Sequence, residues 1–405
     1  MKKNLIVAQS GGPTAAINAS LAGVIAAAIS SDSIDTVYGA RYGIQGVLDE
    51  NFINLSEVFE DSKKLEHLKL TPAMALGSCR LKLPSLEKTE IYDKIYTVFK
   101  KYNIGFFVYI GGNDSMDTAM KLNKYFTEKG EDIKVIGVPK TIDNDLAMTD
   151  HCPGFGSAAK FVATVLTEIV SDALVYNVPA VVIVEIMGRN AGWLTASAAL
   201  TRECTGFAPQ LIYLPEVVFD LDNFIEDVKT VQAQSNCVIV AVSEGAKVAD
   251  GRYLSELSSD CKTDTFGHKY TSGAGKFLEN LVTERLGCKV RSIELNVLQR
   301  GSGHILSKDD IDSAFEIGKA AVNAASNGVS GKMMVFLRTD KDDYEYSIST
   351  CDLDMVANFE KKFPLDWITP RGNDVTEDAV KYLKPLIQGE TATPMKDGLP
   401  IHFKF

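Results

Sequence analysis

The stretch IGFFVYIGGNDSMDTAMKLNKYFTEKGEDIKVIGV, residues 104 to 138, contains two short apolar runs with a longer amphipathic run between them. The apolar runs at 104–110 and 134–138 have the length of buried strands, and residues 113–128 have the spacing of a helix that covers a sheet. A strand, a helix and a second strand in this order form a right-handed unit with parallel strands. The stretch therefore predicts an α/β fold.

The same alternation continues along the rest of the chain. Further apolar runs typical of buried strands lie at residues 4–8, 35–40, 180–186, 210–214, 237–242 and 289–295, and one more lies at 333–338. Helical stretches separate most of them, at residues 14–30, 157–174 and 272–286. This pattern predicts mainly parallel sheets with helices on both faces.

The length and composition of the chain limit its class. With 405 residues and 45% hydrophobic content, two large lobes are expected, because single cores stop growing near roughly 250 to 300 residues. The net charge of −11 argues against a general nucleic-acid binder. No run approaches the roughly 18 apolar residues of a membrane span, and the seven cysteines lack metal-ligand spacing, so a reduced, cytoplasmic protein is expected.

Two glycine pairs follow predicted strands. Ligands collect beyond the carboxyl ends of parallel strands. There Gly11 and Gly12 would either let an anion approach the next helix or only form a tight strand-to-helix turn. Gly111 and Gly112 repeat this arrangement, followed by Asn113 and Asp114. Asp114 would either cap the helix or occupy the place of a further phosphate, and the Asn113 side chain could offer an oxygen to Mg²⁺.

A lysine and two acids follow the strand at 134–138. Thr141, Asp143 and Asp145 alternate, a strand-like pattern that would put their side chains on one face. One carboxylate could accept a proton and the other act through a metal, while Lys140 would neutralise a phosphoryl group. The segment is also ordinary turn sequence, and without the residues at the other strand ends that interpretation would be preferred.

Arginines and one more acid follow the later strands. Gly188 and Arg189 follow the run at 180–186, Glu244 follows the run at 237–242, and Arg291 and Arg300 come near the run at 289–295. Arginine suits bidentate contact with phosphate. Glycine turns, acids and arginines at successive strand ends predict a phosphoryl-transfer site for a phosphorylated substrate. The sequence contains no GxxxxGK[ST] phosphate-binding loop.

Six motifs occur in order along the chain: GGPTAAIN, GSCR, GGNDS, PKTIDND, VEIMGR and LQRG. Together they resemble the phosphofructokinases over roughly residues 4 to 320. The resemblance implies two Rossmann-like three-layer lobes with the active site in the cleft between them. The implied lobes are residues 1–155, to which the chain returns at about 300–330, and residues 156–299, with 331–405 as a C-terminal extension packed on the lobes.

The resemblance also implies an enzyme that transfers a phosphoryl group to the 1-hydroxyl of fructose 6-phosphate. It places the proton acceptor on Asp143 and a second acid on Asp145. Sugar-phosphate contacts fall on Thr141, Asp143, Asp145, Met187, Gly188, Arg189, Glu244, Arg291 and Arg300, and donor contacts on Gly11, Gly12, Arg80, Gly111 and Gly112. Mg²⁺ would be held by Asn113 and Asp145, and a homo-oligomer, a dimer or tetramer, is expected.

Two residues indicate the phosphoryl donor. ATP-using members of the family resemble GGDG and PGTIDND, whereas this chain has Asp114 and Lys140 at the corresponding positions. Asp114 would set a negative charge where the α-phosphate of a nucleotide should lie. Lys140 would bind the phosphate that leaves and stabilise charge in the transition state. The sequence therefore predicts pyrophosphate as the donor, and with it a reversible reaction.

Some positions depart from the family pattern and leave alternatives open. Asn113 replaces the usual metal-binding acid, Ala16 stands where glycine is usual, Val297 replaces a polar ring, and Ala180 replaces the arginine that bacterial ATP enzymes take from a neighbouring subunit. The alternatives are an ATP-dependent sugar-phosphate kinase, a kinase of the NAD or lipid type, and a non-catalytic sugar-phosphate-binding paralogue. Sedoheptulose 7-phosphate remains open as a second acceptor.

Overall fold

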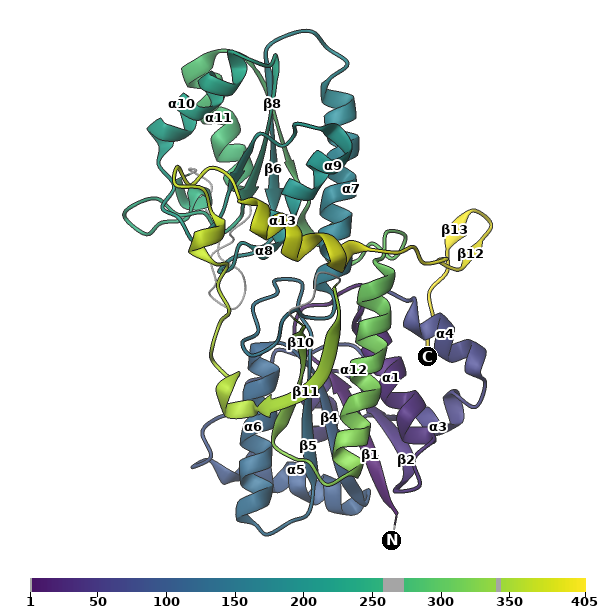
Figure 1. The fold of residues 1–405 in the computed structure, drawn as a ribbon. Helices are drawn as coiled ribbons and strands as arrows, with labels where there is room; N and C mark the ends of the chain where they lie inside the picture. Colours follow the sequence, from purple (N-terminus) through teal and green to yellow (C-terminus); the bar gives the residue numbers. More distant parts are fainter. Residues whose placement is uncertain (1, 258–272, 340–343) are drawn as a thin grey trace.

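The computed structural model describes residues 2–257, 273–339 and 344–405, and its two larger, mainly parallel sheets lie one above the other in the view of Figure 1. The larger sheet has the order β11-β10-β5-β4-β1-β2-β3. Its strands are β1 (Lys3–Gln9), β2 (Ile34–Ala40), β3 (Phe52–Asn54), β4 (Ile104–Gly111), β5 (Lys134–Pro139), β10 (Lys332–Arg338) and β11 (Tyr346–Asp352). All neighbours are parallel except the two edge strands, β3 and β11.

Helices cover both faces of the larger sheet because alternate residues of its strands point in opposite directions. Leu5 and Val7 of β1 pack with α1 (Ile17–Ile29) and α12 (Lys308–Ser326). Ile6 and Ala8 belong to the opposite core, with α5 (Thr89–Lys101) and α6 (Asn113–Glu128). These two cores fix the carboxyl ends of β1, β4 and β5 at one edge of the sheet.

The smaller sheet has the order β7-β8-β6-β9, and all its strands are parallel. Its strands are β6 (Ala180–Ile186), β7 (Leu211–Tyr213), β8 (Cys237–Ser243) and β9 (Lys289–Glu294). Helix α7 (Phe155–Ala173) covers one face, and α10 (Leu221–Gln232) and α11 (Ala274–Leu286) cover the other. The remaining regular elements are short: α2 (Gly43–Leu48), α3 (Leu55–Val58), α4 (Ser62–Lys69), α8 (Trp193–Ala196), α9 (Arg202–Thr205), α13 (Glu377–Leu383), β12 (Met395–Lys396) and β13 (Leu399–Pro400).

The predicted α/β class with mainly parallel sheets is confirmed. Every strand predicted from an apolar run is present, although the helix expected at 272–286 begins at Ala274 and residue 272 lies outside the described residues. The strand at 333–338 was predicted, but its place beside β5 was not, so part of the predicted C-terminal extension completes the larger sheet. The division into lobes at residues 155, 299 and 331 stays a prediction.

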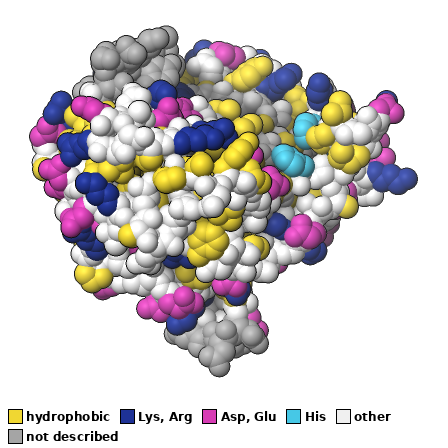
Figure 2. Space-filling view, turned by 90° about the horizontal axis from the view of Figure 1, so that it is seen from above, with side chains coloured by type: hydrophobic (Ala, Val, Ile, Leu, Met, Phe, Trp, Pro, Cys, Tyr) yellow, Lys and Arg dark blue, Asp and Glu magenta, His cyan; other side chains and the backbone are white. Residues whose placement is uncertain are grey.

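On the face shown in Figure 2, basic and acidic side chains of the described residues are interspersed, and hydrophobic side chains gather near the middle. Among the described helices, none is both long and apolar enough to cross a membrane.

Helices α1 and α12 cross in close contact through two glycines. A β-carbon built at Gly318 would lie 2.1 Å from the Ser20 carbonyl oxygen, and one built at Gly23 would lie 2.0 Å from the Phe315 carbonyl oxygen. We expect Gly318→Ala to lower the free energy of unfolding by roughly 1 to 3 kcal/mol, because overpacking forces the two helix backbones apart. Urea denaturation measures the change.

A second helical glycine provides the control for this prediction. A β-carbon at Gly275 in α11 would meet its nearest neighbour, Glu185, at 3.4 Å, an ordinary contact. Gly275→Ala should therefore lose less stability than Gly318→Ala. Equal unfolding midpoints for Gly318→Ala and the unmodified protein would show that α1 and α12 can move apart without a loss of stability.

Candidate active site

Three loops at the carboxyl ends of β1, β4 and β5 are bonded to one another through Lys140. Lys140 is only 3% exposed, and its Nζ donates to the Gly12 carbonyl oxygen at 2.7 Å. The Lys140 backbone N–H donates to the Gly111 carbonyl oxygen at 3.0 Å. Gly11 has a left-handed φ of 85°, and a β-carbon there would lie 3.1 Å from Lys140 Nζ. Glycine at this position lets the lysine reach the first loop.

A pocket of about 310 Å³ opens beside these loops. It is lined by Ser10, Gly11, Gly12, Cys79, Arg80, Leu81, Lys82 and Asp114. Four residues predicted to contact the donor or set its identity therefore lie together, from three separate segments of the chain. The helix-capping alternative for Asp114 is not observed, since Gly112 occupies the N-cap of α6 and no side chain caps it. Asp114 instead forms an ion pair of 2.8 Å with Lys82, which the sequence analysis missed.

The acid loop, residues 141–150, leaves β5 and turns back toward α7. The predicted strand-like alternation is wrong here, because Asn144 has a left-handed φ of 53° and reverses the chain between the two acids. The Thr141 hydroxyl accepts a hydrogen bond from the Asp143 N–H at 3.1 Å. Asn144 is fully buried, accepts from the Cys152 N–H at 3.0 Å and donates to the Tyr382 hydroxyl at 2.9 Å. The turn thus still brings both carboxylates to one place.

The charges of this region shift one another's ionisation. Burial, together with the negative charges of Asp145 and Glu244, raises the pKa of Asp143 to about 7, against the opposing effect of Lys140 and Arg300. Burial also raises the pKa of Asp145. Burial lowers the pKa of Lys140 to about 8, although both acids favour its charged form. A carboxyl group with a pKa near neutrality can exchange a proton at physiological pH.

The second sheet supplies the facing wall. Gly188, with a φ of 130°, donates its N–H to Glu244 Oε1 at 3.4 Å, and its carbonyl oxygen accepts from the Ser243 hydroxyl at 2.7 Å. The Met187 N–H donates to Gln299 Oε1 at 3.2 Å. Arg189 follows on an exposed turn. Met187, Gly188, Arg189 and Glu244 therefore lie at the ends of the neighbouring strands β6 and β8, as predicted.

Arg300 connects this wall to the donor pocket. A β-carbon at Gly12 would lie 3.3 Å from Arg300 Nη1, which is a tight contact, so a larger residue there would crowd the guanidinium. Burial and the like charge of Arg80 lower the pKa of Arg300, whereas Asp143 and Glu244 favour its charged form. The charge of Arg300 therefore interacts with the acids Asp143 and Glu244 and with Arg80 of the donor pocket.

Two predicted site residues do not reach this site within one chain. Arg291 lies in the middle of β9 opposite Val182, where its guanidinium is 3.4 Å from Asp172, rather than at the strand end. Asn113, predicted as a ligand of Mg²⁺, has both ends of its amide engaged: Oδ1 accepts from the Asn358 N–H at 2.5 Å, and Nδ2 donates to the Phe359 carbonyl oxygen at 2.6 Å. Its oxygen is therefore used for protein structure.

Metal ligands are sparse in the site. Within the described ranges, no cluster of three or more His, Cys, Asp or Glu side chains could alone hold a metal ion. A cation there would need oxygens from a substrate in addition to a carboxylate of the acid loop. Mg²⁺ is commonly bound this way, by one or two carboxylates together with substrate phosphates.

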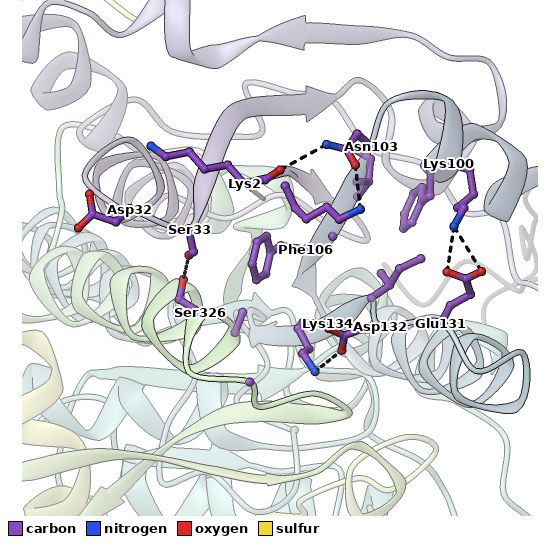
Figure 3. A pocket seen from close by; sticks show the side chains of 17 residues that line it. Lys2, Asp32, Ser33, Lys100, Asn103, Phe106, Glu131, Asp132, Lys134 and Ser326 are labelled. Carbon is purple, nitrogen blue, oxygen red and sulfur yellow. Dashed lines mark hydrogen bonds and ion pairs between the residues drawn. The ribbon is translucent and has the colours of Figure 1, made fainter.

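A larger pocket, of about 870 Å³, lies elsewhere, at the amino-terminal ends of β1, β4 and β5 (Figure 3). Four of its charged residues pair within the pocket, Lys100 with Glu131 at 3.1 Å and Lys134 with Asp132 at 2.6 Å. Ligands of parallel α/β sheets collect at the opposite, carboxyl end of the strands. The candidate site is therefore identified by the loops that meet after β1, β4 and β5, and not by the volume of the pocket.

Sequence reasoning also missed residues 358–363, which contact the acid loop and the loop after β6. The Lys361 N–H donates to the Asp145 carbonyl oxygen at 2.7 Å, and Glu360 Oε1 accepts from Asn190 Nδ2 at 2.7 Å. This segment does not follow a predicted strand, so no pattern in the sequence connected it to the site.

Comparison with known proteins gives consistent matches. The family model described as Phosphofructokinase matches residues 4–325. The pyrophosphate–fructose 6-phosphate 1-phosphotransferase of Methylococcus capsulatus is 40% identical over 403 residues, 98% of this chain and 94% of that protein. The protein of the same name from Xanthomonas campestris pv. campestris is 41% identical over 401 residues, again 98% and 94%. The crystal structure of pyrophosphate-dependent phosphofructokinase from Marinobacter aquaeolei is 39% identical, with a TM-score of 0.88, and the match covers 99% of this chain and 95% of that one.

Proposed function

Because the chain belongs to the phosphofructokinase family, we propose that it transfers a phosphoryl group reversibly from pyrophosphate to the 1-hydroxyl of fructose 6-phosphate. The products are fructose 1,6-bisphosphate and phosphate, as in glycolysis and gluconeogenesis. The observation that carries the choice of donor is the pair Asp114 and Lys140, which come from neighbouring strand ends and border the same glycine loops. Relatives that match almost the full chain bear the name of this reaction.

Lys140 and Asp114 have different roles in selecting the donor. Lys140 lies at the base of the glycine loops, where its ammonium would bind the phosphate that leaves from pyrophosphate. Asp114 lines the donor pocket and carries a negative charge where a nucleotide would place its α-phosphate. A repulsive charge can reject one ligand without helping the other, so the Asp114 carboxylate, which pairs with Lys82, would exclude ATP while Lys140 favours pyrophosphate.

In the proposed mechanism Asp143 accepts the proton of the 1-hydroxyl while the oxygen attacks the nearer phosphorus of pyrophosphate in line. Its pKa of about 7 leaves a large ionised fraction at neutral pH and a base strong enough to take the proton. Lys140 and Arg300 offset the charge that develops on the phosphate oxygens. Arg189, Met187 and Gly188 hold the sugar phosphate on the facing wall.

Members of this family generally use a divalent metal, and Mg²⁺ fits the residues of this site in part. Asp145 would hold it together with oxygens of pyrophosphate, because the Asn113 amide is engaged by residues 358 and 359. When bound, Mg²⁺ neutralises phosphate charge and aligns the two phosphoryl groups. Removing it with a chelator should abolish turnover and leave the fold unchanged.

A homo-oligomer in the cytoplasm completes the proposal. Strand β9 is an edge strand of the smaller sheet, and Arg291 lies on it beside an apolar groove of about 260 Å³ that includes Val165, Ile169 and Ile293. An edge strand presents unpaired backbone groups that can pair with another chain. In a dimer or tetramer in which a second copy of the chain covers β9, Arg291 would lie at the interface between the two copies.

The test of the function is the initial rate of fructose 1,6-bisphosphate formation with Mg²⁺ and fructose 6-phosphate, with pyrophosphate and ATP supplied separately at equal concentrations. We expect turnover with pyrophosphate alone. Turnover with ATP alone would be consistent with a phosphofructokinase but would refute pyrophosphate as its phosphoryl donor. Absence of turnover with both, together with binding of fructose 6-phosphate, would indicate the non-catalytic alternative.

Exchange of both donor residues should change donor preference. Asp114→Gly combined with Lys140→Gly removes the repulsive charge and the group that binds pyrophosphate, so pyrophosphate activity should fall and ATP activity should appear. The ratio of kcat/KM values for ATP and pyrophosphate measures the effect. Lys82→Gly, which removes the partner of Asp114 but leaves its charge, is the control and should not admit ATP.

Activity should depend on pH with a narrow maximum. Asp143 must be ionised to accept a proton, so kcat/KM should rise as pH passes about 7. Lys140 must stay charged, so kcat/KM should fall as pH passes about 8. If kcat/KM stays constant from pH 6 to 9, the ionisation of Asp143 and of Lys140 does not affect the rate-limiting step.

A further inference from the structure

Residues 358–363, which we call the strap, run between the two sheets and contact both. At one end, Asn358 and Phe359 bond the Asn113 amide in the first turn of α6, next to the donor residue Asp114. At the other end, the Phe363 N–H donates to Glu216 Oε1 at 3.0 Å, and the same oxygen accepts from the Gly192 N–H at 2.9 Å. The strap therefore joins the donor helix to the loop that follows β6.

The middle of the strap lies along the acid loop. The Lys361 N–H bonds the Asp145 carbonyl oxygen, and residues 146 and 360 form an antiparallel bridge. The Lys361 side chain then crosses behind the loop, where Nζ donates to the carbonyl oxygens of Asp150 at 2.7 Å and Thr149 at 3.1 Å and to Asn144 Oδ1 at 3.4 Å. An ammonium has three donors, and all three are used on this loop.

The same ammonium also contacts the facing wall. Nζ lies 5.0 Å from the centroid of the Trp193 ring, and the indole N–H donates back to the Lys361 carbonyl oxygen at 3.0 Å. Trp193 is 3% exposed and opens α8, four residues after Arg189. A lysine over an indole face is a favourable cation–π pair. Lys361 thus connects the acid loop to the segment that presents Arg189.

Lys361 is a buried cation whose three hydrogen-bond acceptors are neutral oxygens, so burying its charge is unfavourable. Burial lowers the pKa of Lys361, and transfer of a charged group from water is unfavourable unless its donors are satisfied. An apolar side chain of similar length would avoid that cost but could not hold three oxygens of a turning loop. The geometry is suited to fixing the loop rather than to stabilising the core.

We propose that Lys361 is a positioning residue for phosphoryl transfer, which rests on the function proposed above. Its ammonium fixes the turn at residues 144–150 and so orients Asp143 and Asp145, and its contact with Trp193 keeps that turn in register with the Arg189 segment. It touches no reacting atom in this role. The C-terminal part of the chain thereby contributes to the active site.

Lys361→Met and Lys361→Gln test the proposal in the full-length protein, with kcat, both KM values and the melting temperature measured for each. Methionine removes charge and donors, and we expect kcat to fall about 10²-fold, the effect of displacing reacting groups by about 1 Å. The KM for fructose 6-phosphate should change less than about threefold, since Met187 and Gly188 on the facing wall are held by hydrogen bonds that do not involve Lys361. Glutamine restores two N–H donors and should recover part of the lost kcat.

The control is Lys384→Met, which removes an exposed lysine paired with Glu203 in the same part of the chain and should leave kcat unchanged. A folded Lys361→Met with unchanged kcat would overturn the proposal, as would Lys361→Gln at the level of Lys361→Met. If methionine prevents folding, unchanged kcat in Lys361→Gln would overturn it, and reduced kcat at unchanged KM would support it. Lack of pyrophosphate turnover by the unmodified protein would instead refute the proposed function.

Discussion

Replacing Asp143 with asparagine should lower kcat with pyrophosphate by about 10²- to 10⁴-fold, the usual contribution of a general base. The amide matches the carboxyl group in shape but cannot accept the proton of the 1-hydroxyl. The pKa of Asp143 responds to burial and to four neighbouring charges: Asp145 and Glu244 raise it, and Lys140 and Arg300 lower it. Steady-state rates with saturating pyrophosphate and fructose 6-phosphate measure the loss.

The stability of this variant distinguishes lost chemistry from lost structure. The pKa of Asp143 is about 7 in the folded protein and near 3.8 in an unfolded chain, so folding favours the protonated form. The ionised carboxylate therefore costs stability as pH rises above 3.8, and the full cost is present once pH exceeds about 7. Asp143→Asn, which is always neutral, should be at least as stable as the unmodified protein at pH 8 in metal-free buffer.

Asp132→Asn is the matched control, because Asp132 precedes β5 at the opposite end of the strand and its side chain is 87% exposed. It should retain full activity. An Asp143→Asn variant within about threefold of the unmodified kcat would exclude Asp143 as the base, because general-base losses are far larger.

Replacing Lys140 with methionine should lower kcat with pyrophosphate by about 10²- to 10³-fold, the cost of removing one preorganised charge-stabilising donor. The ammonium is held by the Gly12 carbonyl oxygen at 2.7 Å, next to the pocket where the donor would lie. Its loss also leaves Asp143 and Asp145 with less neutralising charge, so the proton acceptor would ionise at higher pH. Rates at several pH values separate these two effects.

Lys134→Met is the control for this change, since Lys134 begins the strand that Lys140 follows and pairs with the exposed Asp132 at the other end. A rise in the KM for pyrophosphate with unchanged kcat would mean that Lys140 binds the donor equally in the ground and transition states. That result would show that Lys140 contributes to binding of pyrophosphate but does not stabilise charge in the transition state.

Residues at strand ends could be predicted from sequence because the fold itself gathers them. The loops with Gly12, Gly112 and Lys140 follow three neighbouring parallel strands, whose carboxyl ends share one edge. Position along the strand mattered as much as residue type. Arg291 has suitable chemistry but lies in mid-strand, whereas Arg300, beyond the end of β9, comes close to Gly12.

Contacts between distant segments could not be predicted. The oxygen of Asn113 looked available for a metal, but its partner is a backbone N–H of residue 358. The acceptors of Lys361 are backbone carbonyls and one amide, which carry no residue-specific signal. Asn144 could adopt its left-handed turn because asparagine tolerates that conformation, yet the same letters also fit an extended strand.

A ribosome must release most of the chain before the larger sheet can close. Strand β5 ends at Pro139, but its outer neighbour β10 begins only at Lys332, after the whole smaller sheet has been synthesised. At roughly 5 to 20 residues per second, the open edge of β5 is present for many seconds, and an open edge readily pairs with other chains. A chaperone that shields β5 should therefore raise the soluble yield without changing the stability of the finished protein.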